Sequence, residues 1–246
     1  MPRYRTILQI SRYGLLQVWL IRADERYASQ LKNKLTPSFW QREQPKAGRN
    51  SLRLYLDIDK PGSGERLMIK VAKTQKAADY FRRSFRSQGK REFNGSRTLL
   101  RLGLKCPEPV GYGINLVPWS RFDSIFICRH LPDTVTARHQ LESLKEKADR
   151  ERIIEAAARD LAVMLKNNLF QRDAHFGNIL LDPAYMDDLY WIDNDLQQIS
   201  SNDRGRVINS LMRRIATKRH ASQKLILQKE EVEWMHQVIT RHLATI

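Results

Sequence analysis

Hydrophobic residues recur with two different periods along this chain of 246 residues. Residues 51–59 alternate apolar and polar side chains like a half-buried strand, and residues 65–73 form a second strand after the turn-forming KPGSG. From Asp149 onward the apolar residues instead recur at helical spacing, with charges on the other face, until about Asn168. This order predicts an α+β fold with a β-rich N-lobe (1–131), a mostly helical C-lobe (132–246) and a cleft between them.

Other segments are assigned from local composition. YGLLQVWLI is compatible with a strand or a short helix, and RYASQLKNKL is typical of a helix that ends before Pro37. A helix is predicted over 75–101, with Gly103 as its stop signal. The Pro- and Gly-rich residues 106–113 are predicted as a connector, and 114–131 as two strands around a turn. Residues 204–246 are predicted as helices, with these core candidates: Leu211, Ile215, Leu225, Val232, Trp234, Met235 and Ile239.

The most unusual feature of the composition is its excess of positive charge. The chain has 43 Lys and Arg against 27 Asp and Glu, a net charge of +16. Basic residues are densest over 70–101 and 203–224, which favours an anionic partner such as a phosphorylated substrate, anionic lipid headgroups or nucleic acid. Cys106 and Cys128 are too few for a disulfide framework, and neither an 18-residue apolar run nor a signal peptide is present, so we expect a cytoplasmic protein.

The stretch FQRDAHFGNILLD (170–182) places Asp173, His175 and Asn178 in one polar loop. Taken alone, this loop is compatible with a metal site, an acid/base site or an ordinary solvated turn. Phosphoryl transfer from ATP requires a cation on the phosphates, oxygen ligands for Mg²⁺ and a carboxylate near the attacking hydroxyl. Asp173 can be that carboxylate, and Asn178 and Asp193 can supply oxygen ligands.

Two upstream residues complete the set. Lys70 lies on the second strand of the predicted hairpin, and Glu92 lies on the helix that follows. The five positions occur in the order of the protein-kinase signature, which is a far rarer coincidence than any one of them. Lys73 is a rival to Lys70, but its odd offset puts it on the opposite face of the strand.

Several neighbouring residues have a structural interpretation. His175 is expected to be a hydrogen-bonded structural histidine, Arg172 to anchor the loop, and Asp195 to end a strand. Gln171 stands where protein kinases usually have His, a residue that acts mainly as a structural prop.

On REFNGSRTLLRLGLKCPEPVGYG, FQRDAHFGNILLD and WIDND, the sequence resembles the lipopolysaccharide core kinases, which are the bacterial Kdo and heptose kinases, distant relatives of protein kinases. The resemblance covers about Gly48 to Arg214. It implies a bilobal protein-kinase-like fold and Mg²⁺- and ATP-dependent phosphorylation of an inner-core sugar hydroxyl. It makes Asp173 the catalytic base and Asn178 and Asp193 the metal ligands.

The resemblance also implies the nucleotide-binding residues. Lys70 and Glu92 position the phosphates, Gly48 is what remains of a glycine-rich loop, and Arg129 and His130 in CRHL form the hinge beside adenine. Inner-core lipopolysaccharide is polyanionic and is assembled at the cytoplasmic face of the inner membrane. The expected partners are therefore ATP, this acceptor and an anionic membrane surface in peripheral contact, rather than nucleic acid.

Two alternatives remain open at this point. One is a kinase that acts on a protein or another small molecule. The other is a catalytically inactive kinase-like module that binds an anionic polymer through its basic faces, which the five intact positions argue against.

Overall fold

The structure is a computed structural model that describes residues 3–13, 15–36, 51–58, 65–73, 86–118, 120, 122–217 and 225–244. The chain forms two compact units, Met1–Arg97 with Pro107–Leu131 and Thr98–Cys106 with Pro132–Ile246. The predicted lobe boundary after residue 131 leaves Thr98–Cys106 in the first lobe, whereas this segment belongs to the second compact unit. The predicted α+β fold, β-rich first and mostly helical later, is confirmed.

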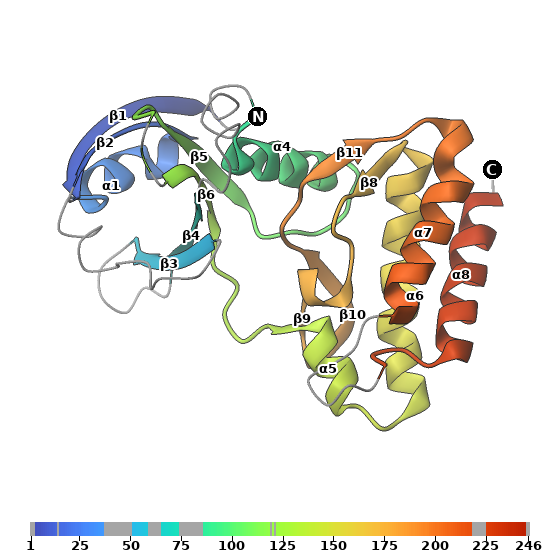
Figure 1. Cartoon of the computed structure of the whole chain (residues 1–246). Helices are drawn as coiled ribbons and strands as arrows, with labels where there is room; N and C mark the ends of the chain where they lie inside the picture. Colours follow the sequence, from blue (N-terminus) through green and yellow to red (C-terminus); the bar gives the residue numbers. More distant parts are fainter. Residues whose placement is uncertain are drawn as a thin grey trace. The chain divides into compact units, whose positions relative to one another are not determined.

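The first unit is built on a six-stranded antiparallel sheet in the order β1-β2-β5-β6-β4-β3 (Figure 1). The strands are β1 (Tyr4–Tyr13), β2 (Leu15–Asp24), β3 (Ser51–Asp57), β4 (Arg66–Lys73), β5 (Pro109–Asn115) and β6 (Phe122–Arg129). The predicted hairpin is confirmed as the β3–β4 pair, and the undecided YGLLQVWLI segment is part of a strand pair.

Both faces of this sheet are covered. On β4, Leu67, Ile69 and Val71 join a core that includes Tyr27 and Leu31 of the helix α1 (Glu25–Lys34). Met68, whose side chain points to the opposite face, packs with a cluster around Phe93 of the helix α4 (Gln88–Arg101). The strand β4, which lies between β6 and β3, is therefore apolar at most positions, and Lys70 within it is enclosed by protein.

The connector predicted over 106–113 is wrong, because most of it belongs to β5. Its glycines permit close packing rather than a turn. A Cβ at Gly111 would lie 2.5 Å from the carbonyl oxygen of Arg22, and one at Gly113 would lie 2.8 Å from the side chain of Ile125. The number of glycines in a segment does not distinguish a turn from a strand that packs closely against its neighbours.

The start of α4 lies against β6. The amide of Gly89 donates to the hydroxyl of Ser124 at 2.9 Å, and a Cβ at Gly89 would lie 2.2 Å from the carbonyl oxygen of Ile125. This close approach sets the distance between α4 and the sheet. The helix predicted over 75–101 is confirmed in its described part, which ends before Gly103 as expected; 74–85 lies outside the described residues.

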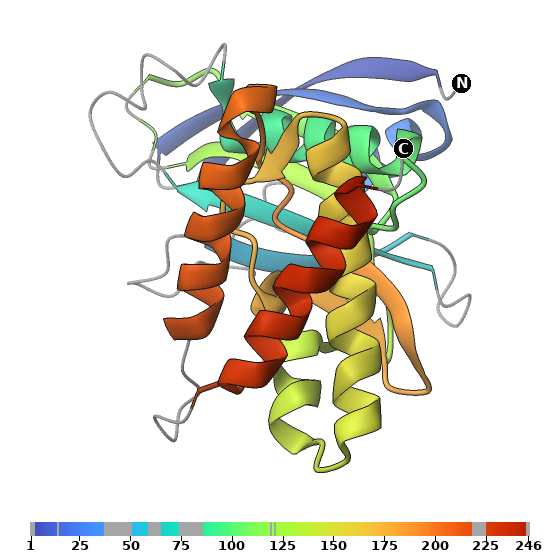
Figure 2. The ribbon, with the colours of Figure 1, turned by 90° about the vertical axis from the view of Figure 1, so that its right-hand side faces the viewer.

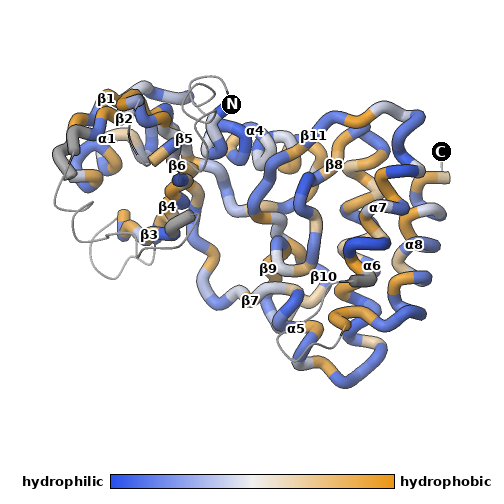
Figure 3. The backbone as a smooth tube through the Cα atoms, in the orientation of Figure 1, coloured by the Kyte–Doolittle hydropathy of each residue, from blue (hydrophilic) through white to orange (hydrophobic). Residues whose placement is uncertain are grey.

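The second unit is built around the long helix α6 (Lys147–Lys166). Helix α8 (Lys229–Ala244, red in Figure 2) packs against α6, and α7 (Arg204–Thr217, orange) packs against α8. The other elements of this unit are β7 (Val135–Thr136), α5 (Ala137–Ser143), β8 (Leu169–Gln171), η1 (Phe176–Asn178), β9 (Ile179–Asp182), β10 (Tyr185–Trp191), β11 (Leu196–Gln198) and η2 (Ser201–Asp203). Hydrophobic and hydrophilic stretches alternate along these helices (Figure 3), as the helical period of the sequence predicts.

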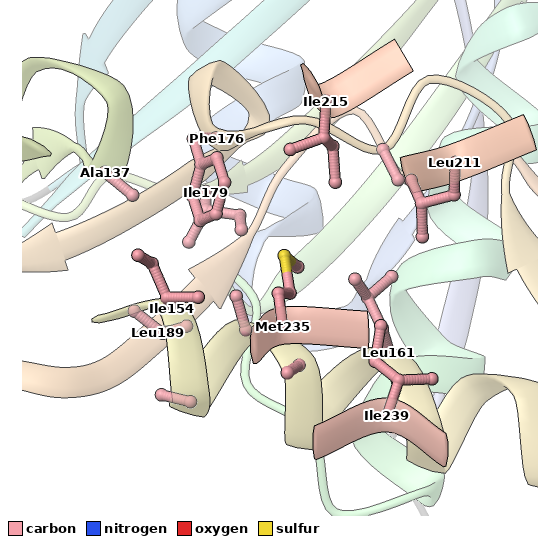
Figure 4. Packing of buried hydrophobic residues seen from close by; sticks show 14 of the residues in the cluster. Ala137, Ile154, Leu161, Phe176, Ile179, Leu189, Leu211, Ile215, Met235 and Ile239 are labelled. Carbon is pink, nitrogen blue, oxygen red and sulfur yellow. The ribbon is translucent and has the colours of Figure 1, made fainter. Parts of the chain in front are cut away.

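The core of the second unit gathers apolar side chains from α6, α7, α8 and the β9–β10 pair. Figure 4 shows Ile154 and Leu161 of α6 together with Met235 and Ile239 of α8. Most predicted core residues of the last helices are buried or half-buried. Leu225 is the exception, because it precedes α8 and remains 36% exposed.

An ion pair also joins α6 to α8. Arg150 contacts Glu231 with two hydrogen bonds, of 2.7 and 2.8 Å, and donates to the carbonyl of Ile226 at 2.9 Å. Burial raises the pKa of the Glu231 carboxyl, but hydrogen bonds from Arg150 and the Gln228 amide outweigh it and hold that pKa below its usual range. The pair therefore links the first turns of α6 and α8, in addition to the apolar contacts that these helices make in the core.

We expect Gly89→Ala to destabilise the protein by about 1–3 kcal/mol, because the added methyl group meets the backbone of β6 and must push α4 away. Guanidinium unfolding measures the loss. Gly205→Ala is the matched control, since no heavy atom lies within 4 Å of its Cβ position on α7 and the change should be neutral or slightly stabilising. Equal stabilities of the two variants would contradict this account of the α4 position.

Candidate active site

Lys70 and Glu92 form a buried ion pair in the first unit. The ammonium nitrogen lies 2.7 Å from Oε1 of Glu92, and the two side chains are only 6% and 3% exposed. Gln88, one turn earlier on α4, donates to the same carboxylate oxygen at 2.8 Å. The sequence-predicted pair is therefore present, and its ammonium is that of Lys70 rather than of the rival Lys73.

The backbone amides of the predicted hinge residues, Arg129 and His130, already donate hydrogen bonds within the first unit. The amide of Arg129 donates to the carbonyl of Glu108 at 2.9 Å, and that of His130 donates to Arg66 at 2.8 Å. The guanidinium of Arg129 lies 3.5 Å from both Glu65 and Glu108. An adenine contact at these two residues would thus use a carbonyl oxygen rather than an amide, and the hinge role stays a prediction.

Gly48, the remaining nucleotide-binding candidate, lies outside the described residues.

In the second unit, the loop after β8 is closed by its own hydrogen bonds. The side-chain amide of Asn178 donates to the backbone carbonyl of Asp173 at 2.9 Å, and its backbone amide donates to the carbonyl of His175 at 2.8 Å. Asn178 is buried, whereas the side chain of Asp173 is 70% exposed. Because the amide nitrogen of Asn178 is engaged, its amide oxygen is the atom suited to bind a cation.

His175 is oriented toward Asp173. Its Nδ1 accepts a hydrogen bond from the amide of Gly177 at 3.0 Å, so in the neutral ring the proton is on Nε2. That Nε2 lies 3.4 Å from Oδ2 of Asp173. The histidine thus has the hydrogen-bonded structural role that the sequence predicted, and it also presents an N–H to the candidate base.

Gln171 ties this loop to the segment that carries Asp193. It is fully buried, and its side-chain nitrogen donates to the carbonyls of Ile192 at 2.7 Å and Asp193 at 3.1 Å. The strands β8 and β11 pair directly, and the amide of Ile192 donates to the carbonyl of Asn178 at 3.0 Å. The structure therefore brings 171–178 and 192–196 together, with Gln171 as the prop.

Asp193 has a left-handed backbone, with φ of +57°. A non-glycine residue in this region carries strain, which persists where the surroundings fix it and which is common at functional sites. Here the fixing contacts reach the Asp193 carbonyl, which accepts from Gln171 and, at 2.8 Å, from the amide of Asp195. The left-handed backbone of Asp193 sets the direction in which its carboxylate, a candidate metal ligand, leaves the chain.

These donors suit a hard cation. Among the described residues no group of three His, Cys, Asp or Glu could hold a metal ion by itself. The amide oxygen of Asn178 and the carboxylate of Asp193 are oxygen donors of the kind that Mg²⁺ takes when it binds few protein groups and several phosphate oxygens or waters. The residues present thus fit a nucleotide-bound Mg²⁺ better than a structural metal centre.

Sequence reasoning missed Asp160, a carboxylate of α6 that supports this region. The indole N–H of Trp191 donates to it at 2.7 Å, two residues before Asp193. Burial raises the pKa of Asp160 to about 6, although the Trp191 hydrogen bond and Arg159 act in the opposite direction. The signal in the sequence was the position of Asp160 beside the apolar stripe of α6, next to Leu161 and three residues after Ala157.

Comparisons with known proteins gave results for solved structures alone. No protein-family model matches the chain, and no curated protein matches it. It is similar to WaaP in complex with acyl carrier protein, with 18% identity, a TM-score of 0.49, and coverage of 80% of this chain and 87% of that one. The bifunctional kinase-methyltransferase WbdD has 14% identity, a TM-score of 0.43, and coverage of 76% and 46%.

Vaccinia related kinase 3 is also similar, with 10% identity, a TM-score of 0.36, and coverage of 80% of this chain and 53% of that one. The order of elements in this chain, a six-stranded sheet with α4 followed by a mostly helical unit, is the α+β order that the sequence predicts.

We expect Gln171→Leu to lower the free energy of unfolding by about 2–3 kcal/mol, because one buried and one partly buried carbonyl lose their donor. Guanidinium unfolding measures this effect, with Gln197→Leu on the exposed part of β11 as the control. Gln171→His, which keeps a ring N–H, should recover part of the loss. A loss no larger than that of Gln197→Leu would contradict the role of Gln171 as a prop.

Because the pKa of Asp160 is raised in the folded protein, we expect the free energy of unfolding to depend on pH. Because its folded pKa is raised from 3.8 to about 6, the stability it contributes is fully present below about pH 4 and is lost as the pH rises through 6. Asp160→Asn keeps an acceptor for Trp191 without the charge, so it should be more stable than the parent by about 1–3 kcal/mol at pH 7.5 and nearly equal at pH 4. Chemical unfolding at both pH values, with Asp187→Asn as a surface control, tests this; a constant difference would exclude the titration of Asp160.

Proposed function

We propose that this protein is an ATP-dependent phosphotransferase with an alcohol group as acceptor. The observation that supports it most is the arrangement in the second unit, where Gln171 and the β8–β11 pair join the Asp173–Asn178 loop to the left-handed Asp193. A carboxylate exposed to solvent beside two oxygen donors on tied segments is the set of groups that phosphoryl transfer needs.

In this proposal Asp173 accepts the proton of the attacking hydroxyl. Its 70% exposed side chain leaves room for an acceptor, and the Nε2–H of His175 at 3.4 Å orients one of its oxygens. The hydroxyl oxygen then attacks the terminal phosphorus of ATP, its proton moves to Asp173, and ADP leaves with the electrons of the broken P–O bond.

Lys70 binds the nucleotide phosphates in this scheme. Burial and the contact with Glu92 hold its ammonium in one place, so no side-chain freedom is lost when the phosphates bind. Asn178 and Asp193 would hold Mg²⁺, which supplies charge neutralisation for the phosphates when bound.

For the acceptor we propose a sugar hydroxyl of the lipopolysaccharide inner core, on heptose or Kdo. The sequence resemblance supports this choice, as does a net charge of +16, which suits a polyanionic acceptor. The location proposed is the cytoplasmic face of the inner membrane, by peripheral contact. Among the described residues, no helix has the length and apolar character needed to span a bilayer.

The test is transfer of radiolabelled phosphate from ATP to lipopolysaccharide purified from a strain that lacks this gene. We expect Asp173→Asn to reduce kcat by about 10²–10⁴-fold, because the general base is removed while the loop keeps its shape. Lys70→Met should also reduce transfer strongly. Asp187→Asn, a surface carboxylate paired with Arg152, is the matched control and should leave the rate unchanged.

Unchanged transfer by Asp173→Asn would refute the mechanism. Transfer to a protein or small-molecule panel in place of lipopolysaccharide would refute the acceptor but keep the kinase. The absence of both a thermal shift with Mg²⁺ and ATP and any transfer, together with salt-sensitive RNA binding, would favour an inactive module that binds anionic polymers.

A further inference from the structure

The excess positive charge is concentrated in the β-rich unit. Met1–Arg97 and Pro107–Leu131 together contain 24 Lys and Arg against 10 Asp and Glu, which is +14 of the net +16. The second unit, with 19 against 17, is close to neutral. An anionic partner should therefore meet the first unit, although the candidate base and metal ligands are in the second.

The same unit exposes an apolar surface, which we name the outer patch: Leu8 and Ile10 of β1, Leu20 of β2, and Leu116 just after β5. Their exposed fractions are 58%, 60%, 37% and 45%. Leu8 lies opposite Leu20 in the β1–β2 pairing, and the amide of Leu116 donates to Val18, which lies opposite Ile10. The four side chains are therefore neighbours rather than scattered residues.

The outer patch lies on the face of the sheet that carries α4. Tyr4 is on the same side of β1 as Leu8 and Ile10, and its ring packs edge-on against Phe93 of α4 with 5.5 Å between centroids. Helix α4 therefore packs at the Tyr4 end of β1, whereas the side chains of Leu8 and Ile10 remain exposed. Apolar side chains that continue past their covering helix are typical of an interaction surface.

Cations border this patch. The guanidinium groups of Arg22 and Arg97 lie 5.8 and 5.3 Å from the ring centroid of Tyr4. Arg22 follows Leu20 by two residues on β2, so it lies on the same face as the outer patch. Aliphatic side chains with arginines at their edge match the boundary between the headgroups and acyl chains of an anionic lipid layer.

We propose that the outer patch docks the first unit onto an anionic lipid membrane, with Leu8, Ile10, Leu20 and Leu116 entering the interface and Arg22 and Arg97 contacting headgroup phosphates. Leu and Ile favour lipid over nucleic acid, because single-stranded nucleic acid is bound through stacking on aromatic rings. This inference deepens the proposed function, since it assigns the membrane contact to one surface, but it does not depend on the phosphotransfer step.

The test measures binding of the full chain to sedimented vesicles of phosphatidylethanolamine and phosphatidylglycerol, compared with pure phosphatidylcholine. We expect the anionic vesicles to be preferred, and the preference to weaken with salt. The double variant Leu8→Thr with Ile10→Thr should bind about tenfold or more weakly, because apolar insertion is lost while β propensity is kept. Tyr185→Thr is the matched control, an aromatic residue 64% exposed in the second unit, and should bind like the parent.

Three results would overturn the docking surface. These are equal vesicle binding by the parent and the double variant, a parent dimer that the double variant converts to a monomer, and loss of RNA binding rather than of vesicle binding in the double variant. Unfolding curves show whether the variant is folded, and Leu20→Thr provides a second substitution at the same patch if it is not.

The experiments distinguish a failure of the docking surface from a failure of the proposed phosphotransferase function. The double variant should retain full transfer to a detergent-dispersed acceptor, because β1 is separated by three strands of the sheet from β4, which carries Lys70. Vesicle binding without any transfer by the parent would refute the proposed function and leave the docking surface standing.

Discussion

The ion pair between Lys70 and Glu92 is the constraint on which the first unit depends. A charged pair that is only 6% and 3% exposed is costly unless its geometry is fixed on both sides. The fixing comes from the backbone and side chains around the pair. Gly89 allows α4 to approach β6, Gln88 donates to Glu92, and the apolar residues of β4 are buried against α1 on the opposite face. The sheet and its two helices thus act together to hold one ammonium group.

In the second unit, the main constraint is that two segments, 171–178 and 192–196, lie side by side. The apolar core between its helices makes the unit rigid, while a few hydrogen bonds hold these two segments in position. Gln171 connects the loop to the Asp193 segment, Asn178 closes the loop on Asp173, and Asp160 accepts from Trp191. Because these groups are buried or half-buried, each bond is expensive to lose, and the strained backbone of Asp193 can be maintained.

Charge and exposed apolar surface are distributed unevenly between the units. The unit with the Lys70–Glu92 pair carries almost all of the net charge and the outer patch, whereas the unit with Asp173 is nearly neutral. Such a division is consistent with one unit that meets an anionic surface and another that provides the base. A basic run in the sequence was also a poor guide to exposure, since Lys70 belongs to the run and is buried.

The sequence by itself determined the fold class, the hairpin that carries Lys70 and the order of the five candidate residues, because these follow from hydrophobic period and from spacing along the chain. It could not determine that 106–113 is mostly strand, since glycines at a close approach and glycines in a turn look alike. Nor could it show that Gln171 reaches the carbonyls of Ile192 and Asp193, that His175 faces Asp173, or that Leu8, Leu20 and Leu116 meet on one face. Those relations join residues far apart in the chain or depend on side-chain direction, and only tertiary packing decides them.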